Sequence, residues 1–102
     1  GYEQKKFTPK KGELTLVGSR DGRDGSVTIN QDVNLYMLHL KKGQEISHKI
    51  ASDRHVWLQM AKGDIEINGK VLGNSDAAAI SGEKELKIMA NDNSEMLIFD
   101  LA

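Results

Sequence analysis

The sequence predicts an all-β domain built as a sandwich or a barrel. Short runs rich in Val, Ile, Leu and Met recur about every 8–12 positions, and a Gly, Asn or Asp turn closes each run. Regular short strands separated by turn signals are typical of sandwiches and barrels. No segment of helical length repeats apolar residues at the spacing of an amphipathic helix. The fold class is therefore all-β.

Three strands are predicted in the first part of the chain, at Leu14–Val17, Ser26–Ile29 and Asn34–Leu40. Between the first two, residues 20–25 repeat the triplet Arg-Asp-Gly. Asp-Gly pairs form turns, and the two aspartates lack the alternating oxygen ligands and closing glutamate of an EF-hand calcium loop. We expect a surface loop here, with its arginines solvated or paired with the neighbouring aspartates.

The next two predicted strands, Gln44–Ile50 and Arg54–Lys62, alternate between apolar and polar residues. Because side chains point to opposite faces in turn, alternation places His48 among isoleucines on the face that enters the core. In the second strand it places Val56 inside and Trp57 on the outer face.

Five further strands complete the prediction. They are Asp64–Ile67, Lys70–Leu72, Asp76–Ile80, Lys84–Ala90 and Ser94–Asp100. Asn68 and Gly69 both tolerate a positive φ, so we expect a type I′ turn that joins the first two of these strands into a hairpin.

The chain has 102 residues, the size of one domain. We assign residues 14–102 to a single barrel. The lysine-rich residues 1–13 are assigned to an interdomain linker or edge segment, with a basic arm for an anionic partner as the alternative. Because the chain begins at Gly1 and not at a methionine, we expect a fragment or a processed product of a longer protein.

Charge and composition exclude several classes of partner. Fifteen acidic and fourteen basic residues give a formal charge of -1 and a pI near 6.3, which argues against a nucleic-acid-binding domain. No apolar run approaches the roughly 20 residues that span a bilayer, so we expect no membrane partner. The chain contains no cysteine, which excludes disulfides, thiolate metal sites and a cysteine nucleophile. This composition fits a cytoplasmic protein.

Three histidines, His39, His48 and His55, are the candidates for acid–base or metal chemistry besides the carboxylates. The spacing supports neither a Cys-His pair nor a Ser-His-Asp arrangement. An inward-facing lone histidine is more often a hydrogen-bonded core residue than a metal ligand. We therefore expect a core role for His48, with ligand binding as the alternative.

Glycines at Gly43, Gly63 and Gly69 are spaced as in the two sequence motifs of the cupin family, and the chain resembles that family. The resemblance implies a cupin-type double-stranded β-helix, which is a jelly-roll barrel. It also implies where a metal would bind, because the family's ligands are a His-x-His pair and a glutamate in the first motif and a histidine in the second.

One of these four ligand positions keeps its histidine. The positions fall on His48, Ile50, Val56 and Ile80. A single imidazole does not hold a divalent ion, since working sites use three or four convergent ligands. Each buried aliphatic side chain contributes roughly 1.5–3 kcal/mol, so the former cavity would become part of the core. We therefore expect no metal in this domain.

Several stretches resemble, more specifically, the C-terminal cupin half of bacterial pirin-like bicupins of the quercetin 2,3-dioxygenase type. They are residues 1–7, 21–26, 30–32, 54–59, 62–63, 67–69 and 97–101. The resemblance implies iron or another divalent metal in an N-terminal cupin, where three histidines and a glutamate bind it. No catalytic residue of the family can be placed on this sequence. Metal-dependent oxidoreductase activity is then expected of the parent protein and not of this domain.

Three hypotheses about function follow. The first is a metal-free, non-catalytic module that packs against the N-terminal cupin of the same protein or supports a homodimer. Trp57 is then its interface residue, although the domain's own loops could instead cover Trp57. The second is a small metal-dependent cupin dioxygenase that uses His48 with His39 or His55. The third is a small-ligand-binding cupin in which His48 is the polar contact of an apolar pocket.

Overall fold

The computed structural model describes residues 12–29 and 31–102. Its strands are β1 (Leu14–Ser19), β2 (Val27–Thr28), β3 (Val33–Leu40), β4 (Glu45–Lys49), β5 (His55–Lys62), β6 (Ile65–Ile67), β7 (Lys70–Leu72), β8 (Ala77–Ile80), β9 (Glu85–Ala90) and β10 (Ser94–Leu101). One 3₁₀ turn, η1 (Arg23–Gly25), lies between β1 and β2. The described ranges contain no α-helix, and each predicted strand is present with bounds shifted by a few residues.

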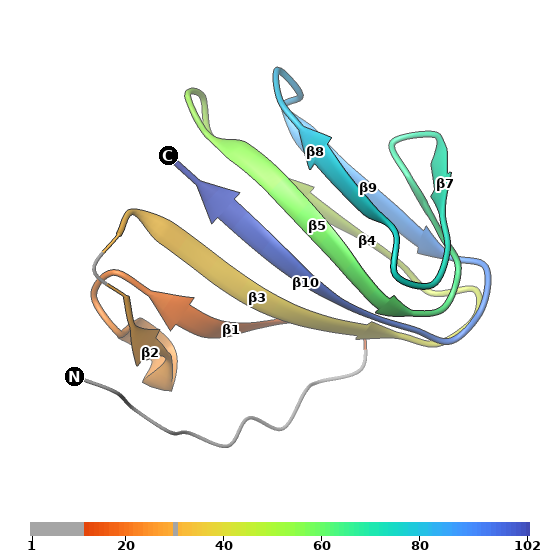
Figure 1. Ribbon diagram of the computed structural model, residues 1–102, viewed down its shortest axis with the longest axis horizontal. Helices are drawn as coiled ribbons and strands as arrows, with labels where there is room; N and C mark the ends of the chain where they lie inside the picture. The colour runs from red at the N-terminus through yellow and green to blue at the C-terminus, as the bar shows by residue number, and fades with distance from the viewer. Residues whose placement is uncertain (1–11, 30) are drawn as a thin grey trace.

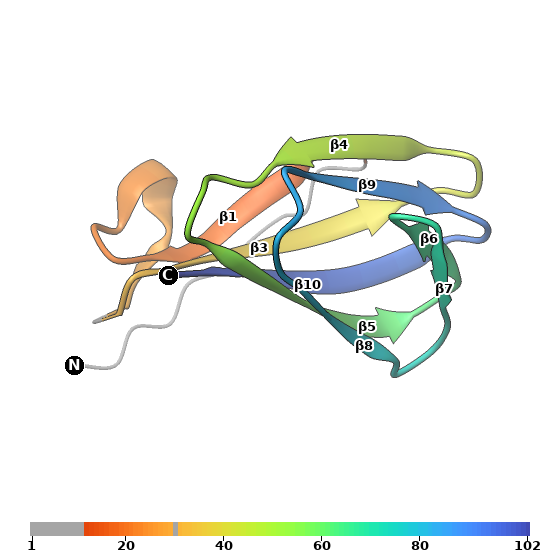
Figure 2. The ribbon, with the colours of Figure 1, turned by 90° about the horizontal axis from the view of Figure 1, so that it is seen from above.

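The strands form two sheets that lie face to face (Figures 1 and 2). The larger sheet has the order β2-β1-β3-β10-β5-β8, and the smaller has the order β4-β9-β6-β7. Neighbouring strands are antiparallel, except that β1 and β2 are parallel. Two facing sheets of short, mainly antiparallel strands are the jelly-roll architecture that the sequence predicted.

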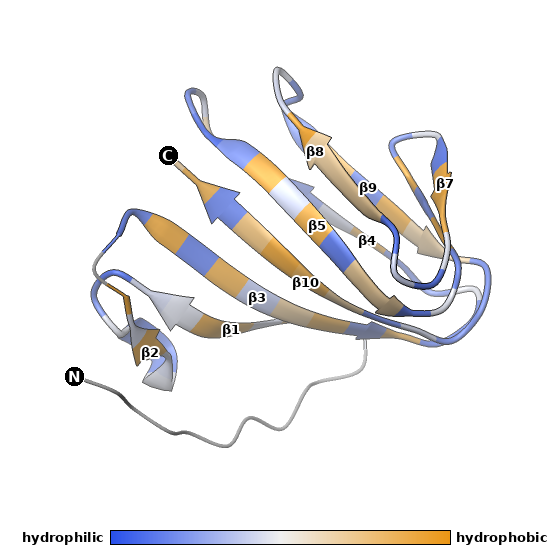
Figure 3. Cartoon of the chain, in the orientation of Figure 1, coloured by the Kyte–Doolittle hydropathy of each residue, from blue (hydrophilic) through white to orange (hydrophobic). Residues whose placement is uncertain are grey.

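The core fills the space between the sheets. Hydrophobic and hydrophilic residues alternate along β5, as Figure 3 shows, so one side of each strand enters the core. The core residues are Leu38, Leu40, Ile50, Val56, Leu58, Met60, Ile65, Ile67, Leu86, Ile88, Ala90, Met96 and Ile98. Burial of each large aliphatic member contributes roughly 1.5–3 kcal/mol, and this burial is the main force that holds the two sheets together.

Two turns depend on particular backbone conformations. Asn68 and Gly69 have φ values of 47° and 85°, which confirms the predicted type I′ turn between β6 and β7. Gly63, between β5 and β6, has a φ of 107°. A Cβ atom there would collide with the Ser94 side chain and would lie 2.6 Å from the Asn93 carbonyl oxygen. Glycine is therefore required at residue 63 for steric as well as conformational reasons.

The Arg-Asp-Gly repeat forms the expected surface turn. The Asp21 carboxylate accepts hydrogen bonds from the backbone N–H and the Nη1 of Arg23, both at 3.2 Å. The first of these bonds lowers the pKa of Asp21. Ser26 turns inward, where its hydroxyl donates to the Arg23 carbonyl (2.6 Å) and lies 2.7 Å from the Ser19 hydroxyl. Because Ser26 belongs to this turn, β2 is shorter than the predicted Ser26–Ile29.

The predicted linker over residues 1–13 falls almost wholly outside the described residues. Within the part of the chain that is described, no helix is long and apolar enough to cross a membrane.

Candidate functional site

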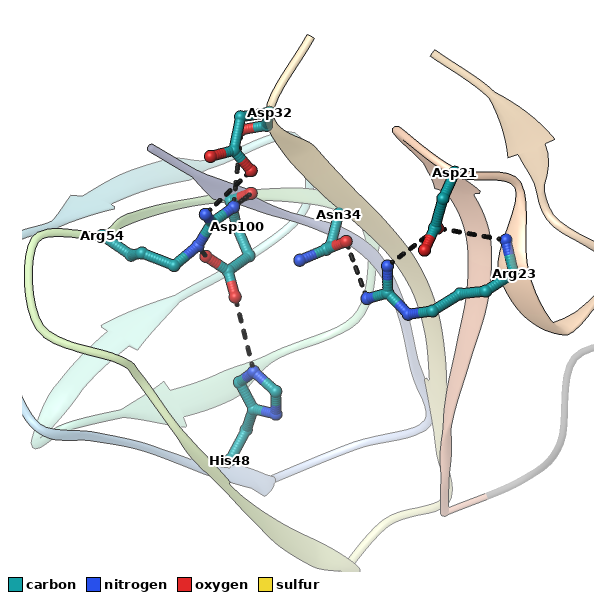
Figure 4. Close-up of polar contacts among 7 residues, drawn as sticks. All are labelled: Asp21, Arg23, Asp32, Asn34, His48, Arg54 and Asp100. Carbon is teal, nitrogen blue, oxygen red and sulfur yellow. Dashed lines mark hydrogen bonds and ion pairs between the residues drawn. The ribbon is translucent and has the colours of Figure 1, made fainter. Parts of the chain in front are cut away.

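A buried carboxylate and a cation meet at one end of the barrel interior (Figure 4). Asp100 follows Met96 and Ile98 on the inner side of β10 and is 6% exposed. Arg54, which precedes β5, donates from Nε to the Asp100 carboxylate and from Nη2 to the Asp100 carbonyl oxygen (2.9 Å). Its Nη1 donates to the Asp32 carboxylate at 2.9 Å. The hydrogen bonds to Asp100 and Asp32 raise the pKa of Arg54.

His48 points at this ion pair from β4 in the opposite sheet (Figure 4). Its Nε2 lies 3.9 Å from the second carboxylate oxygen of Asp100, which is too far for a hydrogen bond. The imidazole packs edge-on against the Tyr36 ring, with 5.5 Å between ring centroids. Among the buried side-chain nitrogen and oxygen atoms of the described residues, only His48 Nε2 lacks a hydrogen-bond partner. The predicted inward orientation is confirmed, but Nε2 does not make the expected hydrogen bond.

The other former ligand positions lie in apolar packing. Ile50 is 7% exposed and Val56 is 1% exposed, and both belong to the core. Ile80 on β8 is partly buried against this core and stands opposite Val56 in the β5–β8 register. These three side chains offer no electron pair to a cation.

The remaining histidines lie away from His48. His39 and His55 alternate with core residues of β3 and β5, so they face outward. His39 Nδ1 is 3.4 Å from a carboxylate oxygen of Glu95, and His55 Nδ1 is 2.9 Å from the Ser81 hydroxyl. Across residues 12–29 and 31–102, no three His, Asp or Glu side chains gather in a group that could hold a metal ion. The residues present therefore do not fit a cupin metal site.

A second feature lies on the side of the larger sheet that faces away from the smaller one. Trp57 on β5 is 42% exposed there, so loops of the described residues do not cover it. Residues paired across β3, β10, β5 and β8 form two neighbouring rows on this side. The first row is Leu35, Phe99, Trp57 and Ala79, and the second is Met37, Leu97, Gln59 and Ala77. All these side chains are half-buried or exposed. We call this surface the outer apolar face.

Sequence reasoning missed Arg54 and Asp100 as partners of His48. A signal for Asp100 was present, because the alternation of β10 places it on the same side as Met96 and Ile98. A carboxylate on an apolar face requires a cationic or hydrogen-bonding partner. Nothing in the spacing identified Arg54 as that partner, since it lies 46 positions away in the sequence.

Comparisons with known proteins agree with this architecture. Residues 16–101 match the family described as the quercetinase C-terminal cupin domain. The chain is 44% identical over 100 residues to the quercetin 2,3-dioxygenase of Escherichia coli (strain K12), covering 98% of this chain and 43% of that protein. The putative quercetin 2,3-dioxygenase PM1685 of Pasteurella multocida is 37% identical over 102 residues, covering 98% of this chain and 43% of that protein.

Solved structures of related proteins have the same fold. The crystal structure of YhhW from Escherichia coli superposes with a TM-score of 0.96 at 42% identity, covering all of this chain and 43% of that one. A structure of YhhW, described as a bacterial pirin, in complex with nickel(II) gives a TM-score of 0.92, covering 97% of this chain and 42% of that one. This chain thus spans less than half the length of these relatives. It belongs to the quercetinase C-terminal cupin domain family of the pirin-like proteins.

Proposed function

We propose that this chain is the metal-free, non-catalytic cupin of a two-cupin pirin-like protein, and that it packs against a metal-bearing N-terminal cupin. The observation that carries the proposal is the outer apolar face, where the exposed Trp57 lies in one row with the half-buried Phe99 and Leu35. Contiguous apolar surface of this kind marks interaction sites, and tryptophan is a frequent energetic centre of interfaces. A homodimer through the same face is the alternative partner.

The metal-free part of the proposal rests on the interior. Ile50, Val56 and Ile80 pack where cupin ligands would stand, and the nearest carboxylate to His48 is bound by Arg54. A relative binds nickel(II). We place any such metal, whether iron or another divalent ion, in the N-terminal cupin of the parent protein. Quercetin 2,3-dioxygenase-type activity then belongs to that half, and the absence of cysteine fits a cytoplasmic setting.

The test is association with the other half. The partner is the part of the Escherichia coli relative that this chain does not match, produced separately. We expect a complex that Trp57→Lys weakens at least about tenfold, because a charge would enter an apolar contact. Val71→Lys is the matched control, since Val71 is the other exposed large apolar side chain among the described residues and lies on the smaller sheet.

Two results would count against this function. In the first, the wild-type chain stays monomeric and does not bind the partner in sedimentation. In the second, it forms a homodimer that is lost in Trp57→Lys and shows no affinity for the partner. The latter would assign the outer apolar face to self-association.

A specific observation favours one second candidate, a small-ligand site at His48. The unpaired Nε2 of His48 and the nearby carboxylate of Asp100 could together bind a small hydroxyl-bearing molecule between the sheets. A panel of small alcohols, phenols and sugars should then raise the melting temperature of the wild-type chain and not that of His48→Leu. Equal shifts in both proteins would remove this candidate.

A further inference from the structure

We propose that the free edge of β8 accepts an added strand, an extended segment from the part of the parent protein that lies outside this chain. The inference rests on the proposed function, because the same partner supplies the segment. It adds a second contact of a different kind, made by backbone hydrogen bonds and not by packing on the outer apolar face.

Within residues 12–29 and 31–102, the backbone of β8 is open on one side. β8 ends the larger sheet, and its one partner strand in these ranges is β5. The Met60 N–H donates to the Asp76 carbonyl (2.8 Å), which makes these two residues a hydrogen-bonded pair. Antiparallel bonding alternates along the ladder, so Ala78 and Ile80 also face β5. The N–H and C=O groups of Ala77 and Ala79 therefore point to the open side.

This edge is four residues long, and it lacks the charge, bulge and proline that usually prevent strand pairing. Natural edge strands are short, charged, bulged or interrupted by proline. Of the other edges, β2 has two residues, β7 carries Lys70, and β4 begins with Glu45 and ends with Lys49. β8 reads Ala-Ala-Ala-Ile, without charge or proline. It is the sheet edge in the described chain best suited to receive a strand.

A groove lies beside this edge. A cavity of about 130 Å³ separates β8 from the β6–β7 hairpin. It is lined by residues 78–81 and Glu83, and by Ile67, Asn68 and Lys70 of the hairpin. A strand added about 4.8 Å from β8 would direct alternate side chains into this space. The small volume selects small side chains at those positions, and backbone pairing excludes proline from the residues opposite Ala77 and Ala79.

Continuity with the outer apolar face identifies the occupant. Ala79 stands next to Trp57 in the β5–β8 register, so the apolar row that carries Trp57 ends at the free edge. A partner that covers Trp57 therefore reaches β8. The relatives carry more than half of their length outside the matched region, which is ample chain to supply one extended segment.

The test compares Ala79→Pro with Ala79→Ser. Proline removes the N–H that would bind the added strand, whereas serine keeps it and is nearly the same size. Because that N–H points away from β5, both variants should fold, as a thermal melt would verify. With the unmatched part of the Escherichia coli relative as partner, we expect Ala79→Pro to bind about tenfold more weakly and Ala79→Ser to bind normally.

Hydrogen exchange on the wild-type chain gives a second measurement that does not depend on the variants folding. Binding should slow exchange at the Ala77 and Ala79 amides. Suppose that Trp57→Lys abolishes binding, that Ala79→Pro binds as tightly as the wild type, and that binding leaves the exchange of the two amides unchanged. The strand-addition inference is then wrong and the proposed function stands. If the wild-type chain does not bind the partner, both are wrong.

Discussion

At the scale of single residues, the interior departs from apolar packing where His48, Arg54 and Asp100 meet. A buried carboxylate is costly unless a partner satisfies it, and Arg54 does so through both its Nε and its Nη2. The pKa of Arg54 is raised by Asp100 and Asp32, so the guanidinium stays charged wherever the protein is folded. His48 completes the group without a hydrogen bond from Nε2.

Removing Arg54 should therefore be strongly destabilising. We expect Arg54→Met to lower the free energy of unfolding by about 3 kcal/mol, because Asp100 would remain buried without a cation. The double variant Arg54→Met/Asp100→Leu should recover much of this loss, since it removes the stranded charge as well. Urea denaturation at neutral pH measures both. A double variant no more stable than the single one would refute this account of the ion pair.

The residue scale also separates what sequence could and could not predict. The inward orientation of His48 and the outward orientation of Trp57 follow from the two-residue period of a strand, which is a local property. The meeting of Arg54 with Asp100 depends on how the chain before β5 lies beside the end of β10. That arrangement is set by the whole fold, and no spacing in the sequence encodes it.

At the scale of elements, strands and hairpins were predictable because apolar runs and turn residues mark them locally. Asn68-Gly69 specified its hairpin, and both residues have the positive φ that the turn requires. The parallel pairing of β1 with β2 was not predictable, since it depends on the inward turn of Ser26 toward Ser19. The order of strands within each sheet likewise follows from tertiary packing.

Two glycines give an element-scale prediction with a built-in control. Gly69→Ala places a Cβ in open space at a φ of 85°, so we expect a loss of about 1 kcal/mol from backbone conformation alone. Gly63→Ala adds a collision with Ser94 and the Asn93 carbonyl group, so we expect at least twice that loss. The measurement is the free energy of unfolding in urea. Equal losses in the two variants would show that the contact between residue 63 and Ser94 does not matter.

At the scale of the whole molecule, the interior and the outer surface support the same proposed function. Three of the four positions that correspond to cupin metal ligands hold aliphatic side chains, and the exposed side of the larger sheet carries the outer apolar face. Both properties support the proposed role of a domain that packs against a second cupin.

Metal content gives the first prediction at this scale. Protein produced with iron, manganese, nickel and zinc available should contain far less than one metal ion per chain after gel filtration, because His48 is the one ligand position that keeps its imidazole. Elemental analysis provides the number. One tightly held ion per chain, lost in His48→Ala, would overturn the metal-free assignment.

The central claim is that the N-terminal cupin packs on the outer apolar face. Trp57 fluorescence reports on this contact directly, because Trp57 is the only tryptophan in the 102-residue sequence. The unmatched part of the Escherichia coli relative, with its own tryptophans replaced by phenylalanine, is added to this chain while Trp57 emission is recorded. If the two halves pack through the outer apolar face, the emission maximum shifts to shorter wavelength and quenching by acrylamide falls. Emission and quenching that match those of the chain alone would contradict packing through this face.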